Sequence, residues 1–72
     1  MNKTQKELRE MTKKFLDDLD GGSDRLDGNL SDNFEAYVSD ARHFLDEEDY
    51  IRAFEAAVFA SGILESETRL QD

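Results

Sequence analysis

The only histidine of the chain, His43, stands between two carboxylates in a segment of helical pattern. Asp40 precedes it by three residues and Glu47 follows it by four, a spacing that places neighbouring side chains on one side of a helix. A histidine in such company can act as a general base or bind a metal ion. Catalysis also requires a pocket and a second reacting group, which the sequence does not indicate here. We therefore interpret His43 as an exposed side chain with charged partners on the helix surface.

Carboxylates recur along the chain, often as adjacent pairs, because 18 of its 72 residues are acidic. At that density such pairs arise by chance and are typical of a solvated surface. One stretch has the length of a calcium-binding loop, with Asp24 at the first position and Glu35 at the twelfth. That loop also requires a ligand at position three and a glycine at position six, where this chain has Leu26 and Asn29. We therefore predict no calcium site.

The other patterns of catalytic and ligand-binding chemistry are missing. The Gly21-Gly22 pair lacks the Lys-Ser/Thr ending of a phosphate-binding loop. The chain has no cysteine, which excludes a disulfide and a Cys/His zinc site. No nucleophile stands beside a base. The sequence thus predicts no catalytic, cofactor-binding or metal-binding residues, and we expect the protein not to be an enzyme.

Basic residues are concentrated at the start of the chain. Residues 1–14 contain five basic and two acidic residues, a balance of +3, whereas the remainder has a balance of −12. Lys6, Arg9, Lys13 and Lys14 form a basic face that is a candidate for binding an acidic partner or nucleic acid. No aromatic residue is interleaved with them to stack on bases. We interpret the face as solvated, and expect its charge to attract the first helix to the acidic remainder in a salt-sensitive way.

Three helices account for most of the chain. The apolar periodicity predicts helices over about residues 3–20, 31–47 and 49–70, with a loop over 21–30. Gly21-Gly22 ends the first helix, Asp32 with Glu35 has the pattern of a capping box for the second, and Asp49 is a suitable N-cap for the third. The very short second turn forces an antiparallel hairpin. We predict a single all-α domain, a three-helix up-down-up antiparallel bundle.

Each of the first two helices has one apolar face. The face of the first contains Leu8, Met11, Phe15 and Leu19, with Thr12 and Leu16 at its edges. The face of the second contains Phe34, Tyr37, Val38, Ala41, Phe44 and Leu45. Leu26 and Leu30 interrupt the polar loop, and we expect them to tuck against the end of the bundle.

The third helix is apolar over more of its circumference than two neighbours can cover. Helical spacing predicts an inward arc of Tyr50, Ile51, Ala53, Phe54, Ala57, Val58, Ser61 and Leu64. A second stripe, on roughly the opposite side, contains Ala56, Phe59, Ala60, Ile63 and Leu70. Either the loop leucines and the first helix wrap further round, or Phe59 and Ile63 centre an exposed patch. In the second case the stripe is a candidate interface for a protein partner or for a homodimer, which would add stability to a small core.

No segment is expected to enter a membrane. The longest uncharged stretch, residues 56–64, is far shorter than the roughly 20 residues that span a bilayer. Residues 1–14 are polar and have no apolar core of a secretory signal. Together with the absence of cysteine, these features lead us to expect a cytoplasmic protein that does not bind membranes.

Residues 39–66, SDARHFLDEEDYIRAFEAAVFASGILES, carry a dense set of recognisable motifs. These are Asp40-Ala41, Phe44-Leu45, Asp49-Tyr50, Arg52-Ala53-Phe54-Glu55 and Gly62-Ile63-Leu64-Glu65. The segment resembles the archaeal domain-of-unknown-function family 357. The resemblance implies an archaeal, cytoplasmic protein with a three-helix up-and-down bundle, and it brings no assigned function.

The chain departs from the family pattern at two places. Glu48 stands where the family tends to have a turn glycine, and a non-glycine residue in a left-handed C-cap costs about 1 kcal/mol or more. A different turn geometry is therefore open here. Phe59 and Ser61 stand where the family often has tryptophans, so this chain has less aromatic surface there.

The hairpin also looks like a broader class of helical domains, some of which are RNA-cleaving HEPN domains. Their signature is an arginine a few residues before a histidine on one helix. Here Arg42 immediately precedes His43, so the motif is absent and that activity is not carried over. The alternative to a protein-interaction module is thus a degenerate HEPN-like, RNA-associated domain that uses the basic face of the first helix.

Overall fold

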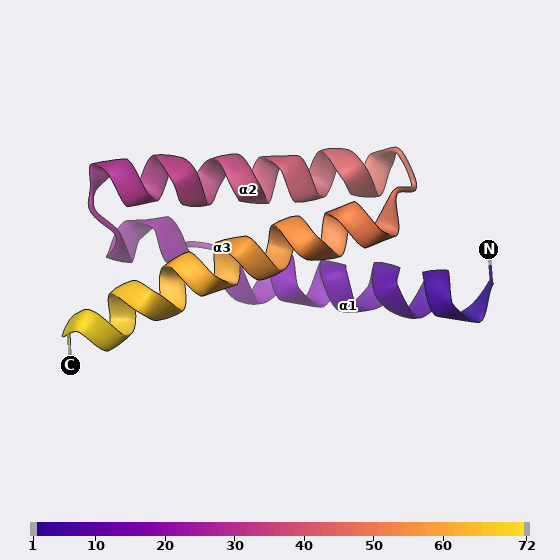
Figure 1. Ribbon diagram of the computed structural model, residues 1–72, viewed down its shortest axis with the longest axis horizontal. Coiled ribbons are helices and arrows are strands. Elements are labelled where there is room, and N and C mark those ends of the chain that lie inside the picture. The colour runs from indigo at the N-terminus through magenta and orange to yellow at the C-terminus, as the bar shows by residue number, and fades with distance from the viewer. Residues whose placement is uncertain (1, 72) are drawn as a thin grey trace.

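The protein, a computed structural model, is an all-α bundle in which three long helices run up, down and up (Figure 1). The structure describes residues 2–71, and the side chains of residues 2–66. The elements are α1 (Lys3–Leu19), the short 3-10 helix η1 (Gly22–Arg25), α2 (Gly28–Asp46) and α3 (Tyr50–Gln71). The described residues contain no strand. The predicted fold class is confirmed. Within the described residues, no helix is long and apolar enough to span a bilayer.

Helix α3 is the central element. It packs along both α2 and α1, whereas α1 and α2 make few contacts with each other. In Figure 1 it passes diagonally in front of α1 and beside α2. The molecule is elongated, with principal extents of 41 × 20 × 15 Å. A helix placed in this way has a neighbour on each flank and no neighbour on its outer side.

Helix α1 begins with a side-chain cap, and a glycine follows its last turn. The backbone N–H of Gln5 donates to Asn2 Oδ1 at 2.8 Å, and the Gln5 side chain accepts from the Asn2 N–H at 3.3 Å. These reciprocal bonds satisfy two of the helix's free donors. Gly21 has φ +76, the left-handed conformation that favours glycine after a helix. The observed end, Leu19, lies within one residue of the predicted end.

The predicted start of the second helix is wrong by three residues. Helix α2 begins at Gly28, because the Asp27 side chain caps it by accepting from the Leu30 N–H at 3.1 Å. Asp32 and Glu35 therefore lie inside the helix and do not form a capping box. Aspartate caps well wherever it precedes a helical turn, so Asp27 takes the role that was predicted for Asp32, and the earlier start keeps Leu30 helical.

The segment predicted as a loop is largely helical and closely packed. Gly22, in η1, is buried, and a Cβ atom built there would lie 2.9 Å from Leu64 Cδ2 and 3.2 Å from Phe34 Cζ. A larger residue at Gly22 would push against the ends of the Leu64 and Phe34 side chains, whereas Gly21 is favoured by its backbone conformation. Leu26 packs against the core as expected.

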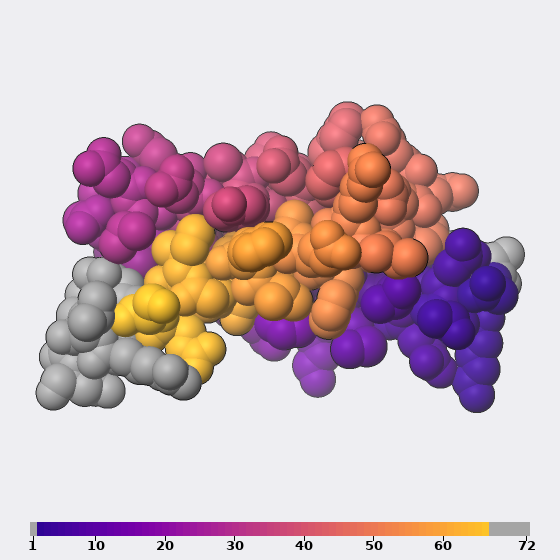
Figure 2. All heavy atoms as spheres, viewed as in Figure 1, coloured from indigo at the N-terminus to yellow at the C-terminus, as the bar shows by residue number. Residues whose placement is uncertain are grey.

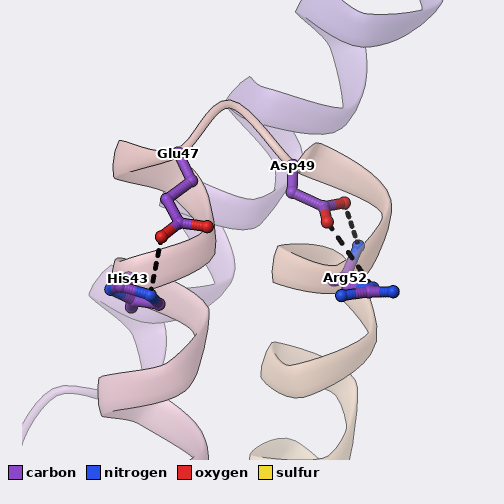
Figure 3. Close-up of polar contacts among 4 residues, drawn as sticks. All are labelled: His43, Glu47, Asp49 and Arg52. Carbon is purple, nitrogen blue, oxygen red and sulfur yellow. Dashed lines mark hydrogen bonds and ion pairs between the residues drawn. The ribbon is translucent and has the colours of Figure 1, made fainter.

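The α2–α3 turn has a left-handed backbone conformation at a residue that is not glycine. Glu48 has φ +63, and the backbone N–H of Asp49 donates to the Phe44 carbonyl at 2.8 Å. Asp49 then caps α3, because its Oδ1 accepts from the Arg52 N–H at 3.3 Å and its Oδ2 lies 3.5 Å from Arg52 Nε (Figure 3). The predicted N-cap is therefore present, and the hydrogen bonds of the turn hold Glu48 in place.

The core is built mainly from leucine and alanine. Its buried cluster comprises Leu16, Leu19, Phe34, Val38, Ala41, Ala56, Ala57 and Ala60. Thr12 of α1 is fully buried, and its hydroxyl donates to the Leu8 carbonyl at 2.7 Å. The predicted apolar face of α1 is therefore rotated, because Thr12 and Leu16 are at its centre while Met11 is half exposed.

Candidate interaction surface

The side of α3 that faces away from the core is largely apolar. We call it the α3 outer face and define it by Ile51, Glu55, Val58, Phe59 and Gly62, all of which are exposed. Helical spacing places these five residues on one side. Ile51 is 63% exposed, Val58 43% and Phe59 60%. Exposed apolar residues gathered in this way are a recognised mark of interaction sites.

An aromatic pair borders this face on the side of α2. The rings of Phe59 and Tyr37 are stacked, with centroids 5.4 Å apart and planes at 26°. Both side chains remain exposed. Further along the same seam, the Arg52 guanidinium lies 5.9 Å from the centre of the Phe44 ring. Figure 2 shows this side of the molecule, with α3 in front, between α2 above it and α1 below it.

A second aromatic pair borders the face on the side of α1. Phe54 and Phe15 meet edge to face, with centroids 5.8 Å apart and planes at 79°. Both are half-buried. Met11, one helical turn before Phe15, continues the apolar surface along α1 and is half exposed. The α3 outer face therefore runs between two seams of aromatic side chains, and Val58 lies between them.

Most aromatic residues of this protein lie at or near the surface, whereas alanines fill much of the core side of α3. Of the seven aromatic residues, only Phe34 and Tyr50 are buried. Alanines fill the side of α3 that faces the core, at positions 53, 56, 57 and 60. Small side chains allow helices to approach closely, and closely packed helices leave room between them for few rings. The rings are consequently placed at the outer edges of the seams.

The structure divides the predicted interface stripe. Ala56 and Ala60 are buried in the core, which corrects their placement on an outward stripe. Ile63 is half-buried and packs against the core, Phe59 is exposed, and the Leu70 side chain lies outside the described residues. At about 100° per residue, positions 56 and 60 share a side with positions 53 and 57.

Three surface residues were missed by the sequence reasoning. Ile51 and Val58 were predicted to be inward, and Tyr37 was placed on the core face of the second helix, but all three are exposed. The signal that would have found them is the spacing of residues 53, 56, 57, 60 and 64, the usual inward pattern of a helix. Once that stripe faces the core, Ile51 and Val58 must face outward.

The polar side chains that suggested chemistry lie on the surface. His43 Nε2 is 2.9 Å from Glu47 Oε1, and the two side chains are 65% and 59% exposed (Figure 3). Helical spacing of four residues accounts for this pair. Within the described residues, no group of three or more His, Cys, Asp and Glu side chains is placed to hold a metal ion.

The predicted basic face is distributed along the solvated side of α1. Lys6, Lys13 and Lys14 are exposed and Arg9 is half-buried. Exposed Glu10 and Asp17 share that side by helical spacing, so carboxylates interrupt the positive charge. The His43–Glu47 and Arg52–Asp49 pairs lie within α2 and at the start of α3, so neither supports the expected attraction between α1 and the other helices.

Fold and surface together define a small helical bundle with an open apolar face on its central helix. The sequence model of a protein family matches residues 4–71, and the family is described as "Protein of unknown function (DUF357)". The match covers nearly the whole chain, so the protein belongs to this family. No curated protein and no solved structure matches the chain.

Proposed function

We propose that this protein is a non-enzymatic interaction module that binds an α-helix of another polypeptide on the α3 outer face. The observation that carries the proposal is the exposure of Phe59, which stacks on an exposed Tyr37 at 5.4 Å between α3 and α2. Together with Ile51 and Val58, these side chains form an apolar strip that Glu55 interrupts, on a chain with a small core.

Burial supplies the driving force. Covering a large apolar side chain that is more than half exposed contributes roughly 1 kcal/mol or more, and the face holds two of them, Ile51 and Phe59. A partner also compensates for the small amount of surface that a short chain can bury by itself. The cost of leaving these residues in water is thus explained by a complex in which they are covered.

The shape of the face favours a helix. Val58 and Gly62 of α3 lie in the middle of the face, and the Phe59–Tyr37 and Phe54–Phe15 pairs lie along its two sides. Nothing lies within 4 Å of a Cβ atom built at Gly62. A helix laid along α3 would find space at that glycine and apolar side chains on both flanks, which its own apolar face could contact.

A selection from displayed helical peptides tests the proposal. Peptides selected on the wild-type chain are expected to lose at least tenfold in affinity for a Val58→Gln/Phe59→Gln double variant, because its strip is polar. The matched control is Ala36→Gln, which changes an exposed position of α2 that helical spacing turns away from α3. Circular dichroism verifies that both variants fold. A library that enriches no peptide sensitive to the double variant would overturn the proposal.

A further inference from the structure

We propose that the helix bound on the α3 outer face is basic, with an apolar stripe flanked by lysine or arginine. This inference rests on the function proposed above and adds the chemical class of the partner. It is carried by the charged residues that surround the apolar strip, which are predominantly carboxylates.

Carboxylates lie on the strip and on both of its long borders. Glu55 is exposed on the strip itself, four residues after Ile51. Asp40 is exposed on α2, one helical turn from Tyr37 and one from Phe44. Asp18 lines a shallow hollow of α1 together with Met11 and Phe15. Each long border of the strip therefore carries an acid beside its aromatic residues.

The end of the strip at the α2–α3 turn is also acidic. An open hollow between this turn and the start of α1 is lined by Glu47, Glu48 and Asp49 together with Leu8 and Ile51. Ile51 belongs to the strip as well, so the hollow continues it.

Few cations offset these acids. Arg52 lies 3.5 Å from Asp49 and is already paired. Lys14 lines the same hollow as Asp18, and Lys3 and Lys6 line another hollow of α1 with Met11, Glu7 and Glu10. The strip and the hollows around it thus have eight carboxylates against four cations, and their potential attracts a positively charged partner.

Charge decides between possible occupants. A second copy of the chain would bring its own net charge of −9 and set one acidic border against another, which opposes association. Nucleic acid is repelled for the same reason. A basic amphipathic helix satisfies both the apolar strip and its border. The strip from Ile51 to Gly62 is about 16 Å long at 1.5 Å per residue, which corresponds to a docked segment of about three turns.

Three synthetic helical peptides test the inference directly. They share one leucine stripe over four turns and differ only in the flanking residues, which are all lysine, all glutamine or all glutamate. We expect the lysine peptide to bind the wild-type chain about tenfold more tightly than the glutamine peptide at low salt, because several border pairs contribute. The glutamate peptide is expected to bind more weakly than either. Isothermal titration gives the affinities, and amide shifts at Ile51, Val58 and Phe59 locate the binding.

Two triple variants separate local charge from net charge. The border variant, Asp18→Asn/Asp40→Asn/Glu55→Gln, is expected to remove most of the preference for lysine. The control, Glu10→Gln/Asp17→Asn/Asp32→Asn, removes the same number of charges at exposed positions that helical spacing turns away from α3. It is expected to retain the preference. Equal losses in the two variants would mean attraction by net charge alone and would overturn the inference.

The remaining outcomes distinguish the inference from the function on which it rests. If all three peptides bind equally and lose affinity for Val58→Gln/Phe59→Gln, the docking function stands and the basic partner is wrong. If no peptide shifts the amides of the strip, both fail. Sedimentation of the wild-type chain tests for self-association. A dimer at low salt that Phe59→Gln dissociates would identify the occupant as a second copy of the chain and would overturn the inference of a basic partner.

Discussion

The two sides of α3 differ in the size of their side chains more than in their polarity. The side that faces the core presents alanines at positions 53, 56, 57 and 60, and the α3 outer face presents Ile51, Val58 and Phe59. The outer face is apolar except for Glu55, yet only the side that faces the core is covered. Packing of the central helix is therefore limited by the distance to its neighbours, and large residues that do not fit between helices remain at the surface.

The largest expected effect compares an aromatic residue of the core with one of the outer face. Phe34→Ala removes a ring that is 2% exposed and is expected to lower the free energy of unfolding by about 4 kcal/mol. Phe59→Ala loses mainly the stacking on Tyr37 and is expected to cost about 1 kcal/mol. Urea denaturation measures both values. Equal costs would show that Phe59 belongs to the core, which would remove the basis of the docking surface.

A second comparison adds volume to each side of α3. Ala57→Leu inserts a larger side chain at a fully buried position and is expected to cost about 3 kcal/mol through overpacking. Val58→Leu enlarges the adjacent, exposed residue and is expected to change stability by less than about 0.5 kcal/mol. Thermal unfolding monitored by circular dichroism resolves the difference. Tolerance of leucine at position 57 would contradict the close approach of the helices.

The same substitution at two glycines is expected to have opposite signs. Gly22→Ala places a methyl group against Leu64 and Phe34 and is expected to destabilise the protein by about 2 kcal/mol. Gly62→Ala meets no neighbour and is expected to stabilise it by about 0.5–1 kcal/mol, because alanine is a better helix former. Chemical denaturation of the two variants in parallel measures the signs. A loss of stability in Gly62→Ala would reveal a contact made at that position.

The smallest effect concerns the turn that begins α3. Glu48→Gly relieves a left-handed backbone at φ +63 and is expected to stabilise the fold by about 1 kcal/mol. Glu47→Gly, at φ −85, provides the control and is expected to bring no gain. Hydrogen exchange is expected to show the same protected residues of α3 in Glu48→Gly and in the wild type. A changed pattern would mean that the turn, rather than the packing of alanines, decides which side of α3 faces the core.

Helix number, order and direction followed from local features of the sequence. The apolar repeats, the Gly21-Gly22 stop and the Asp49 cap each act within one or two helical turns, so they can be recognised without knowing what lies across the bundle. The start of α2 was placed incorrectly because two aspartates were equally able to cap it, and local rules do not choose between them.

Those local features did not predict which side of α3 faces the core. With apolar residues over most of its circumference, hydrophobic spacing alone did not show whether Ala56 and Ala60 or Ile51 and Val58 face the core. The sequence determined that this helix has more apolar surface than two neighbours cover. Only the tertiary structure decided which part stays in water, because α3 packs its alanines against α1 and α2, whose own leucine, valine and phenylalanine side chains fill the core.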